Sequence, residues 1–206
     1  MRKVIAILSV ATALLLSGCS QVGEAASVGS EKITQASVQK SVDAVIAERA
    51  KVSTAGMQVE TGETLNRSQL RFHVVEILLR AVAAEGKISV TKAEIDQRRA
   101  TIITQVGGIA KLPTALVGAG IAKADLNSYL ELIIISEKLS TAATAAGVAA
   151  DNVGAEIQKL MVKKANELKV TVNPRYGKWD ATIGDIVATD SASSANTPAA
   201  APPKTP

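Results

Sequence analysis

Cys19 is the side chain whose type and position most directly indicate a chemical function. It is the only cysteine of the 206-residue chain, and it directly follows the tripeptide Leu16-Ser17-Gly18. Upstream lie two cations, Arg2 and Lys3, and an apolar run from Val4 to Leu16. A charged start, a short apolar segment and small residues before a cut are the layout of a secretory signal peptide. Cleavage just before the cysteine would make its thiol the side chain of the first mature residue.

The tetrapeptide at residues 16–19 resembles the bacterial lipobox, in which a diacylglyceryl group is transferred to the cysteine thiol. The alternative is a transmembrane anchor, but the apolar run has thirteen residues, whereas a membrane-spanning helix needs about 20. We therefore expect a lipoprotein signal peptide over residues 1–18, cleaved between Gly18 and Cys19, and lipidation of Cys19. Two or more acyl chains, such as palmitate, would anchor the protein stably. This predicts a lipid-anchored location on the extracytoplasmic face of the cell membrane.

The other reactive side chains do not suggest a catalytic site. Lipidation would remove Cys19 as a nucleophile, and a metal site of nitrogen and sulfur ligands needs more than the single histidine, His73. His73 lies in the apolar stretch Phe72–Leu79, which favours a neutral, hydrogen-bonded core or boundary histidine over a catalytic base. Glu131 and Glu137 are six residues apart, so they do not face each other on a helix. We predict a protein that is not an enzyme and that uses no metal and no cofactor.

The elements that must position these residues are mainly helices. Apolar residues at three- and four-residue spacing predict helices over about 35–52, 63–85, 92–106, 112–120, 123–146 and 151–168. Thr34 is the expected N-cap of the first helix, and Thr91 forms a capping box with Glu94 at the third. Gly86 is expected to end the second helix in the left-handed conformation, and Asp151 to cap the last helix.

Two short extended segments predict a β element that joins the ends of the domain. One surrounds the turn Gly29-Ser30, and the other is the alternating segment Lys169–Val172. The predicted fold is therefore mainly α, a helical bundle of about five to six helices with a short two-stranded β element. Residues 19–25 would form a tether of at most ~25 Å, residues 26–188 the helical domain, and residues 189–206 a disordered tail rich in Ala, Ser and Pro.

A polar and aromatic motif follows the second extended segment. It comprises Asn173, Pro174, Arg175, Tyr176, Gly177 and Trp179. The Asn-Pro pair ends a strand, Pro fixes a turn, and Gly permits a positive φ. The two aromatic rings can pack over the joined ends of the domain while their polar atoms stay in water. These roles favour a structural motif over a ligand-binding one.

Composition excludes several classes of partner. The formal net charge of +4 falls to +2 once Arg2 and Lys3 are removed with the signal peptide. The basic pairs Arg98-Arg99 and Lys163-Lys164 lie in helical patterns, where they are typical of solvated faces, so we expect no nucleic acid. The four aromatic residues are too few for a protein that stacks bases or encloses sugars.

Four segments in this order resemble the SurA N-terminal-domain family, the helical chaperone domain of exported SurA and PrsA-type foldases. Ala26–Thr34 is similar to the family's opening A-x-V-N-G-x-x-I-T, although Gly-Ser replaces Asn-Gly. Lys87–Ile95 resembles its V-T-x-x-E-I helix start, and Leu112–Leu139 its L…G-I-x-x-x-D-L…E-K-L segment. Val170–Asp180 resembles the V-x-V-N-P-R-Y-G-x-W ending of actinobacterial lipoprotein members.

The resemblance implies a function without the family's usual enzyme. Many members carry a parvulin prolyl isomerase domain before the final helix, but here a short loop separates Ala146 from Asp151. The resemblance therefore implies an ATP-independent holding chaperone for newly exported proteins, whose partners are unfolded or extended exported polypeptides. Met57 and Met161 are the expected client-binding side chains, because methionine adapts to varied apolar ligands in a cleft between helices. The alternative is an envelope adaptor lipoprotein that binds one folded partner.

Overall fold

The computed structural model describes residues 23–189 of the chain. Within them, strands at both ends enclose a helical region. The elements are β1 (Glu24–Val28), β2 (Glu31–Thr34), α1 (Gln35–Arg49), α2 (Gly62–Glu85), α3 (Lys92–Gln105), η1 (Ile109–Lys111), α4 (Leu112–Gly118), η2 (Lys123–Asp125), α5 (Leu126–Ala145), α6 (Ala150–Leu168), β3 (Thr171–Val172), β4 (Lys178–Asp180) and β5 (Asp185–Val187). The predicted mainly helical fold with a short β element is confirmed. The predicted signal peptide, the lipidation site Cys19 and residues 190–206 lie outside the described residues.

The β element joins the two ends of the domain, as expected, but it has three strands. Strand β1 pairs antiparallel with both β2 and β3, and Ala26 lies opposite Val172. The sheet begins at Glu24, the first residue of β1. Ala25, the second residue of β1, is fully buried, and its carbonyl oxygen accepts a hydrogen bond from Asn173 N at 2.8 Å. The last two residues of the predicted tether therefore belong to the folded domain.

Short-range capping signals correctly located two helix starts. Thr34 Oγ1 accepts a hydrogen bond from Ser37 N at 3.0 Å. Thr91 and Glu94 form both bonds of a capping box, with Thr91 N donating to Glu94 Oε2 at 2.8 Å. Such caps satisfy backbone N–H groups that have no partner within the helix.

Two of the predicted helix ends are wrong. The N-cap of α6 is Ala149, and Asp151 lies in the first turn without a capping bond, where its charge still complements the helix dipole. At the end of α2, Gly86 has φ of −76° and Lys87 takes the left-handed conformation, with φ of 53°. The reason is that the last turn of α2 closes through Ile88 N donating to Ala83 O at 2.8 Å, which places the reversal at Lys87.

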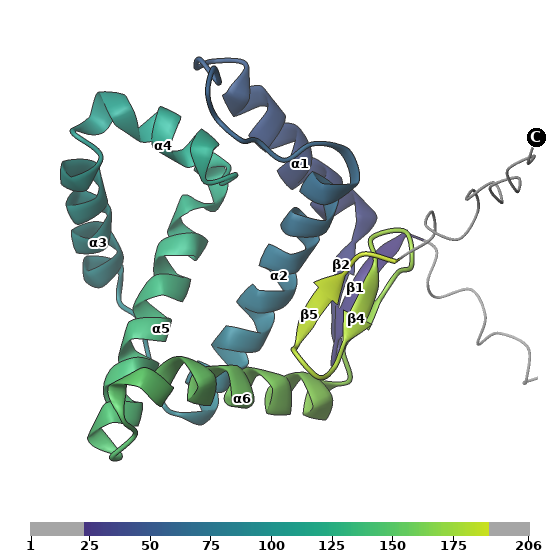
Figure 1. Ribbon diagram of the computed structural model, residues 1–206, viewed down its shortest axis with the longest axis vertical. Coiled ribbons are helices and arrows are strands. Elements are labelled where there is room, and N and C mark those ends of the chain that lie inside the picture. The colour runs from purple at the N-terminus through teal and green to yellow at the C-terminus, as the bar shows by residue number, and fades with distance from the viewer. Residues whose placement is uncertain (1–22, 190–206) are drawn as a thin grey trace, which may run out of the picture.

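The helices are arranged around the contact between α2 and α5 (Figure 1). Helix α6 packs against both of them at one end and leads back to the strands, which lie beyond α2. Helix α3 packs on the other side of α5, and α4 runs from α3 toward α1 at the opposite end. Helices α2 and α5 therefore form a central pair, with the strands packed on the α2 side and α3 packed on the α5 side.

Three groups of buried side chains hold this arrangement together. The first joins the sheet to α1 and α2 and includes Val28 and Val38, while the second lies between α2 and α5 and includes Ile135. The third joins α4 to α5 through Leu116 and Leu130, with partly buried side chains of α3 packed against it. The last two groups fix where the ends of α4 and α5 lie relative to α2.

Within residues 23–189 no single helix has the length and apolar composition needed to cross a membrane. Two pairs of consecutive helical segments meet that requirement only when taken together, and they are bent by 85° and 118°.

Candidate functional site

A cleft of about 490 Å³ opens beside the central helix pair. One wall is the first half of α2, and the opposite wall runs from the end of α4 through η2 into the start of α5. The loop between α1 and α2 forms a third side. Three segments that are distant in sequence therefore surround one space, which has the size and concave shape of a ligand-binding site.

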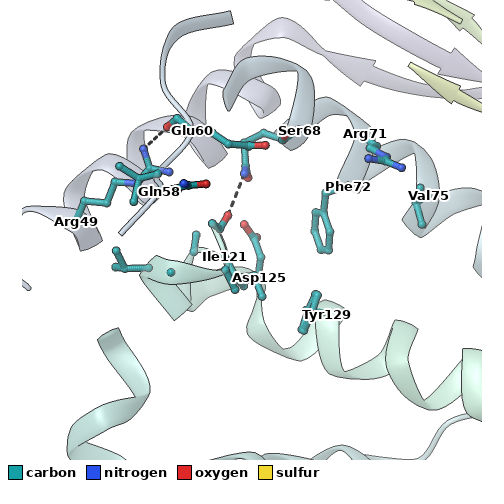
Figure 2. A pocket seen from close by; sticks show the side chains of 17 residues that line it. Arg49, Gln58, Glu60, Ser68, Arg71, Phe72, Val75, Ile121, Asp125 and Tyr129 are labelled. Atoms are coloured by element: carbon teal, nitrogen blue, oxygen red, sulfur yellow. Dashed lines mark hydrogen bonds between the residues drawn. The ribbon is translucent and has the colours of Figure 1, made fainter. Parts of the chain in front are cut away.

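The apolar surface of the cleft is dominated by two aromatic rings. Phe72 of α2 and Tyr129 of α5 point into the space from opposite helices (Figure 2), and the other apolar lining residues are Val59, Val75, Val117, Ala119, Ile121 and Ala122. The Phe72 ring pairs with the adjacent His73 at a centroid distance of 5.7 Å, and no pair with Tyr129 is formed among the described residues. Both rings therefore line the cleft without forming an aromatic pair with each other.

Polar contacts hold the walls of the cleft in place. Gln69, itself buried, donates from Nε2 to the carbonyl oxygen of Gly120 at 3.1 Å, which ties α2 to the segment after α4. Arg49 Nη1 donates to the carbonyl oxygen of Glu60 at 2.5 Å and thereby fastens the loop between α1 and α2 (Figure 2). Arg71 forms an ion pair with Asp185 at 2.7 Å, whereas the buried Nε of Arg49 has no hydrogen-bond partner among the described residues.

Asp125 is the carboxylate that faces the cleft beside Tyr129. The two residues are four positions apart at the start of α5 and lie on the same side of that helix. Although Asp125 holds the N-cap position, its side chain makes no capping hydrogen bond. Burial raises the pKa of the Asp125 carboxyl, and the charge of Glu76 raises it further. Ionised Asp125 is therefore poorly solvated.

The single histidine belongs to a polar network next to the cleft. Ser41 Oγ and His73 Nε2 are 3.0 Å apart, and His73 Nδ1 lies 3.7 Å from Glu76 Oε2. This is the order of nucleophile, base and orienting acid in acyl-transfer enzymes. Ser41, however, is only 7 % exposed, and neither Ser41 nor His73 lines the cleft. The network instead links α1 to α2, and the expected hydrogen-bonded boundary position of His73 is confirmed.

Glu76, unlike Asp125, has hydrogen-bond and ion-pair partners for its carboxylate. Hydrogen bonding with His73 lowers the pKa of Glu76 most, and Ser128 and Arg80 lower it further against the effect of burial. Arg80 in turn bridges Glu76 and Glu131, at 2.9 and 2.6 Å. Glu76 and Asp125 are both half-buried, yet their pKa values shift in opposite directions because only Glu76 has partners.

The structure does not bring the two predicted client-binding methionines into this cleft. Met57 is half-buried in the loop between α1 and α2, and Met161 packs against two of the buried groups. Neither side chain lines the cleft. The aromatic side chains of this cleft are Phe72 and Tyr129, and client binding by the two methionines stays a prediction. The scarcity of aromatic residues was a usable signal, because two of only four in the chain fall here.

The motif from Asn173 to Trp179 lies at the β end of the domain. Asn173 donates from Nδ2 to the carbonyl oxygen of Glu24 at 3.0 Å and accepts from Arg175 N at 3.0 Å. Tyr176 is buried with the first group of core residues, and Trp179 packs against that group from β4. These contacts connect the end of the chain to β1 and support the structural interpretation of the motif.

Two further kinds of observation bear on function, namely metal-binding groups within residues 23–189 and similarity to known proteins. Within that range no three His, Cys, Asp or Glu side chains come together in a group that could hold a metal. Comparisons with protein-family models, with curated proteins and with solved structures found no match. The geometry of the cleft is thus the main guide to function.

Proposed function

We propose that the protein is a membrane-anchored extracytoplasmic lipoprotein that acts as an ATP-independent holding chaperone for newly exported proteins. The observation that carries the proposal is the cleft between α2 and α5, with Phe72 and Tyr129 facing each other across it. An unfolded chain exposes apolar side chains that a folded protein buries, and removing them from water is favourable. Aromatic walls with open space between them suit such side chains without demanding one sequence.

The fixed frame of the cleft also supports this role. The hydrogen bonds from Gln69 and Arg49 hold two walls in place before any ligand arrives. A preformed site loses less conformational freedom on binding than a site that must be ordered. Moderate, reversible binding of many segments is what a holding chaperone needs.

The position of the folded domain relative to the proposed anchor fits the same function. Strand β1 begins at Glu24, five residues after Cys19. Five residues span at most about 18 Å when fully extended. A lipid on Cys19 would therefore keep the sheet end of the domain near the membrane surface, where exported chains emerge unfolded.

An aggregation assay tests the proposal directly. The mature chain that begins at lipidated Cys19, in phosphatidylcholine nanodiscs, should delay the aggregation of an unfolded exported protein at a few-fold molar excess. Tyr129→Ala should lose most of this activity, because it removes one wall of the cleft. Ile183→Ala is the matched control, since Ile183 is 47 % exposed and lies outside the cleft. Unchanged activity in Tyr129→Ala, or no activity in the unaltered chain, would refute the proposal.

Cross-linking in cells separates this function from the adaptor alternative. A holding chaperone should give a broad distribution of cross-linked clients that disappears in Tyr129→Ala. A single stoichiometric product that survives Tyr129→Ala would instead support an adaptor that binds one folded partner elsewhere on the surface.

A further inference from the structure

The unpaired carboxylate in the cleft indicates which segments the site prefers. Asp125 is half-buried, and among residues 23–189 its side chain has no hydrogen-bond or ion-pair partner. The nearby charges of His73 and Lys40 act on it only at longer range. Desolvated charges in proteins are normally paired, because an unpaired one is costly. A ligand that brings a cation to Asp125 would remove this cost.

The surroundings of Asp125 suit a basic side chain in particular. Lysine and arginine have apolar stems that bury against apolar surface while the charged end reaches a polar group. The rings of Phe72 and Tyr129 offer that surface, and their faces attract a cation. An acidic side chain in the same place would be repelled by Asp125.

The other charged groups of the cleft do not alter this preference. Arg49 Nη1 is engaged by the carbonyl oxygen of Glu60, although its buried Nε has no hydrogen-bond partner among the described residues, and Arg71 is engaged by Asp185. The carboxylate of Glu60 belongs to an exposed residue on the loop between α1 and α2. Solvent weakens charge interactions at such an exposed position. Asp125 is therefore the less exposed of the two carboxylates of the cleft, and the one that a bound cation would meet away from solvent.

We infer that Asp125 is the specificity-determining residue of the cleft and selects extended segments in which a lysine or arginine stands next to apolar residues. The basic side chain lies between Phe72 and Tyr129 and pairs with the Asp125 carboxylate. This inference depends on the proposed function, because it assumes that an extended client segment occupies the cleft.

Three labelled peptides of equal length test the inference on the mature chain that begins at lipidated Cys19, in phosphatidylcholine nanodiscs. Each carries two leucines in Gly/Ser flanks, separated by lysine, norleucine or glutamate. Fluorescence anisotropy should show the lysine peptide binding about fivefold more tightly than the norleucine peptide, with the glutamate peptide weakest. Asp125→Asn should weaken the lysine peptide to the level of the norleucine peptide and leave the norleucine peptide unchanged.

Glu31→Gln is the matched control, because it removes the same charge at an exposed position of β2 outside the cleft and should preserve the preference for lysine. Should Asp125→Asn fail to fold, the preference of the unaltered chain must shrink in 1 M salt, where the screening length is about 3 Å. Equal binding of the lysine and norleucine peptides would overturn the inference and leave the chaperone proposal standing. Absence of binding by every peptide would overturn both.

Discussion

Replacing Gly177 by alanine should destabilise the β end of the domain. Gly177 has φ of 135°, a conformation that side-chain-bearing residues rarely adopt. A Cβ atom there would overlap the carbonyl oxygen of Val187 and lie 3.2 Å from Ile186 Cγ2. This overlap is relieved only if β5 moves away from the turn that precedes β4 in the sequence. That movement would disturb the pairing of Lys178 with Val187 at the end of the hairpin.

The expected magnitude follows from these two effects. An unfavourable backbone conformation costs about 1–3 kcal/mol, and forcing extra atoms into a packed site typically costs about 1–3 kcal/mol more. We expect Gly177→Ala to lower the free energy of unfolding by about 3 kcal/mol, or to detach the hairpin while the helices stay folded. The matched control is Gly154→Ala within α6, where an added Cβ meets nothing within 4 Å. The control should raise stability by about 0.5–1 kcal/mol.

Urea unfolding distinguishes these outcomes. Trp179 is the only tryptophan and lies in β4, so its fluorescence reports on the hairpin, while far-ultraviolet circular dichroism reports on the helices. Gly177→Ala should shift the fluorescence transition to lower urea, and Gly154→Ala should shift it slightly higher. An unchanged transition in Gly177→Ala, together with lost client binding, would refute the structural interpretation of the motif.

Three further predictions concern single side chains. Hydrogen bonds from Lys138 and Thr91 lower the pKa of Glu94 to about 2 from an ordinary value of 4.5, so its stabilising contribution is present above pH 4.5 and lost as pH falls through 2. Acid titration of Glu94→Gln should lack this loss between pH 4.5 and 2, and an unaltered titration would contradict the assignment. Leu130→Ala should lower the free energy of unfolding, measured by urea titration, by about 2–5 kcal/mol, because Leu130 is fully buried. A loss below about 1 kcal/mol would show that the fold does not need the third group of buried side chains. Asp125→Asn should raise the thermal midpoint at neutral pH, because burial raises the pKa of Asp125 and its ionised form is disfavoured in the fold. This gain should vanish as pH falls toward 3.8, and a lower midpoint at neutral pH would show that Asp125 has a stabilising partner.

Features encoded by neighbouring residues were predictable from the sequence. The caps at Thr34 and Thr91 depend on side chains within three residues of the backbone groups that they satisfy. The pairing of β1 with β3 followed from the alternating β-branched segment Lys169–Val172 and from the extended residues around the turn Gly29-Ser30. The β4–β5 hairpin was missed because its strands have three residues each and show too little alternation to identify.

The cleft could not be predicted, because its walls come from segments that meet only in the folded molecule. The loop with Val59, helix α2 with Phe72 and the start of α5 with Tyr129 have no sequence relationship that predicts their convergence. The location of Met161 was not predictable for a related reason. Methionine is suited equally to a core and to a binding surface, and only the folded molecule shows that Met161 packs against two buried groups.

The charged side chains that stabilise this fold have ion-pair partners within it, whereas the side chain that we assign to binding has none among the described residues. Arg80 bridges Glu76 and Glu131, and Lys164 lies between two glutamates, so their interactions are complete without a ligand. Asp125 has no such partner among the described residues, and its burial opposes folding at neutral pH. A lysine-containing segment supplies the missing charge, and by linkage a ligand that binds only the folded state must raise its stability. The lysine peptide should therefore raise the thermal midpoint of the unaltered chain by more than that of Asp125→Asn. Equal increases in the two proteins would show that the peptide binds without using Asp125.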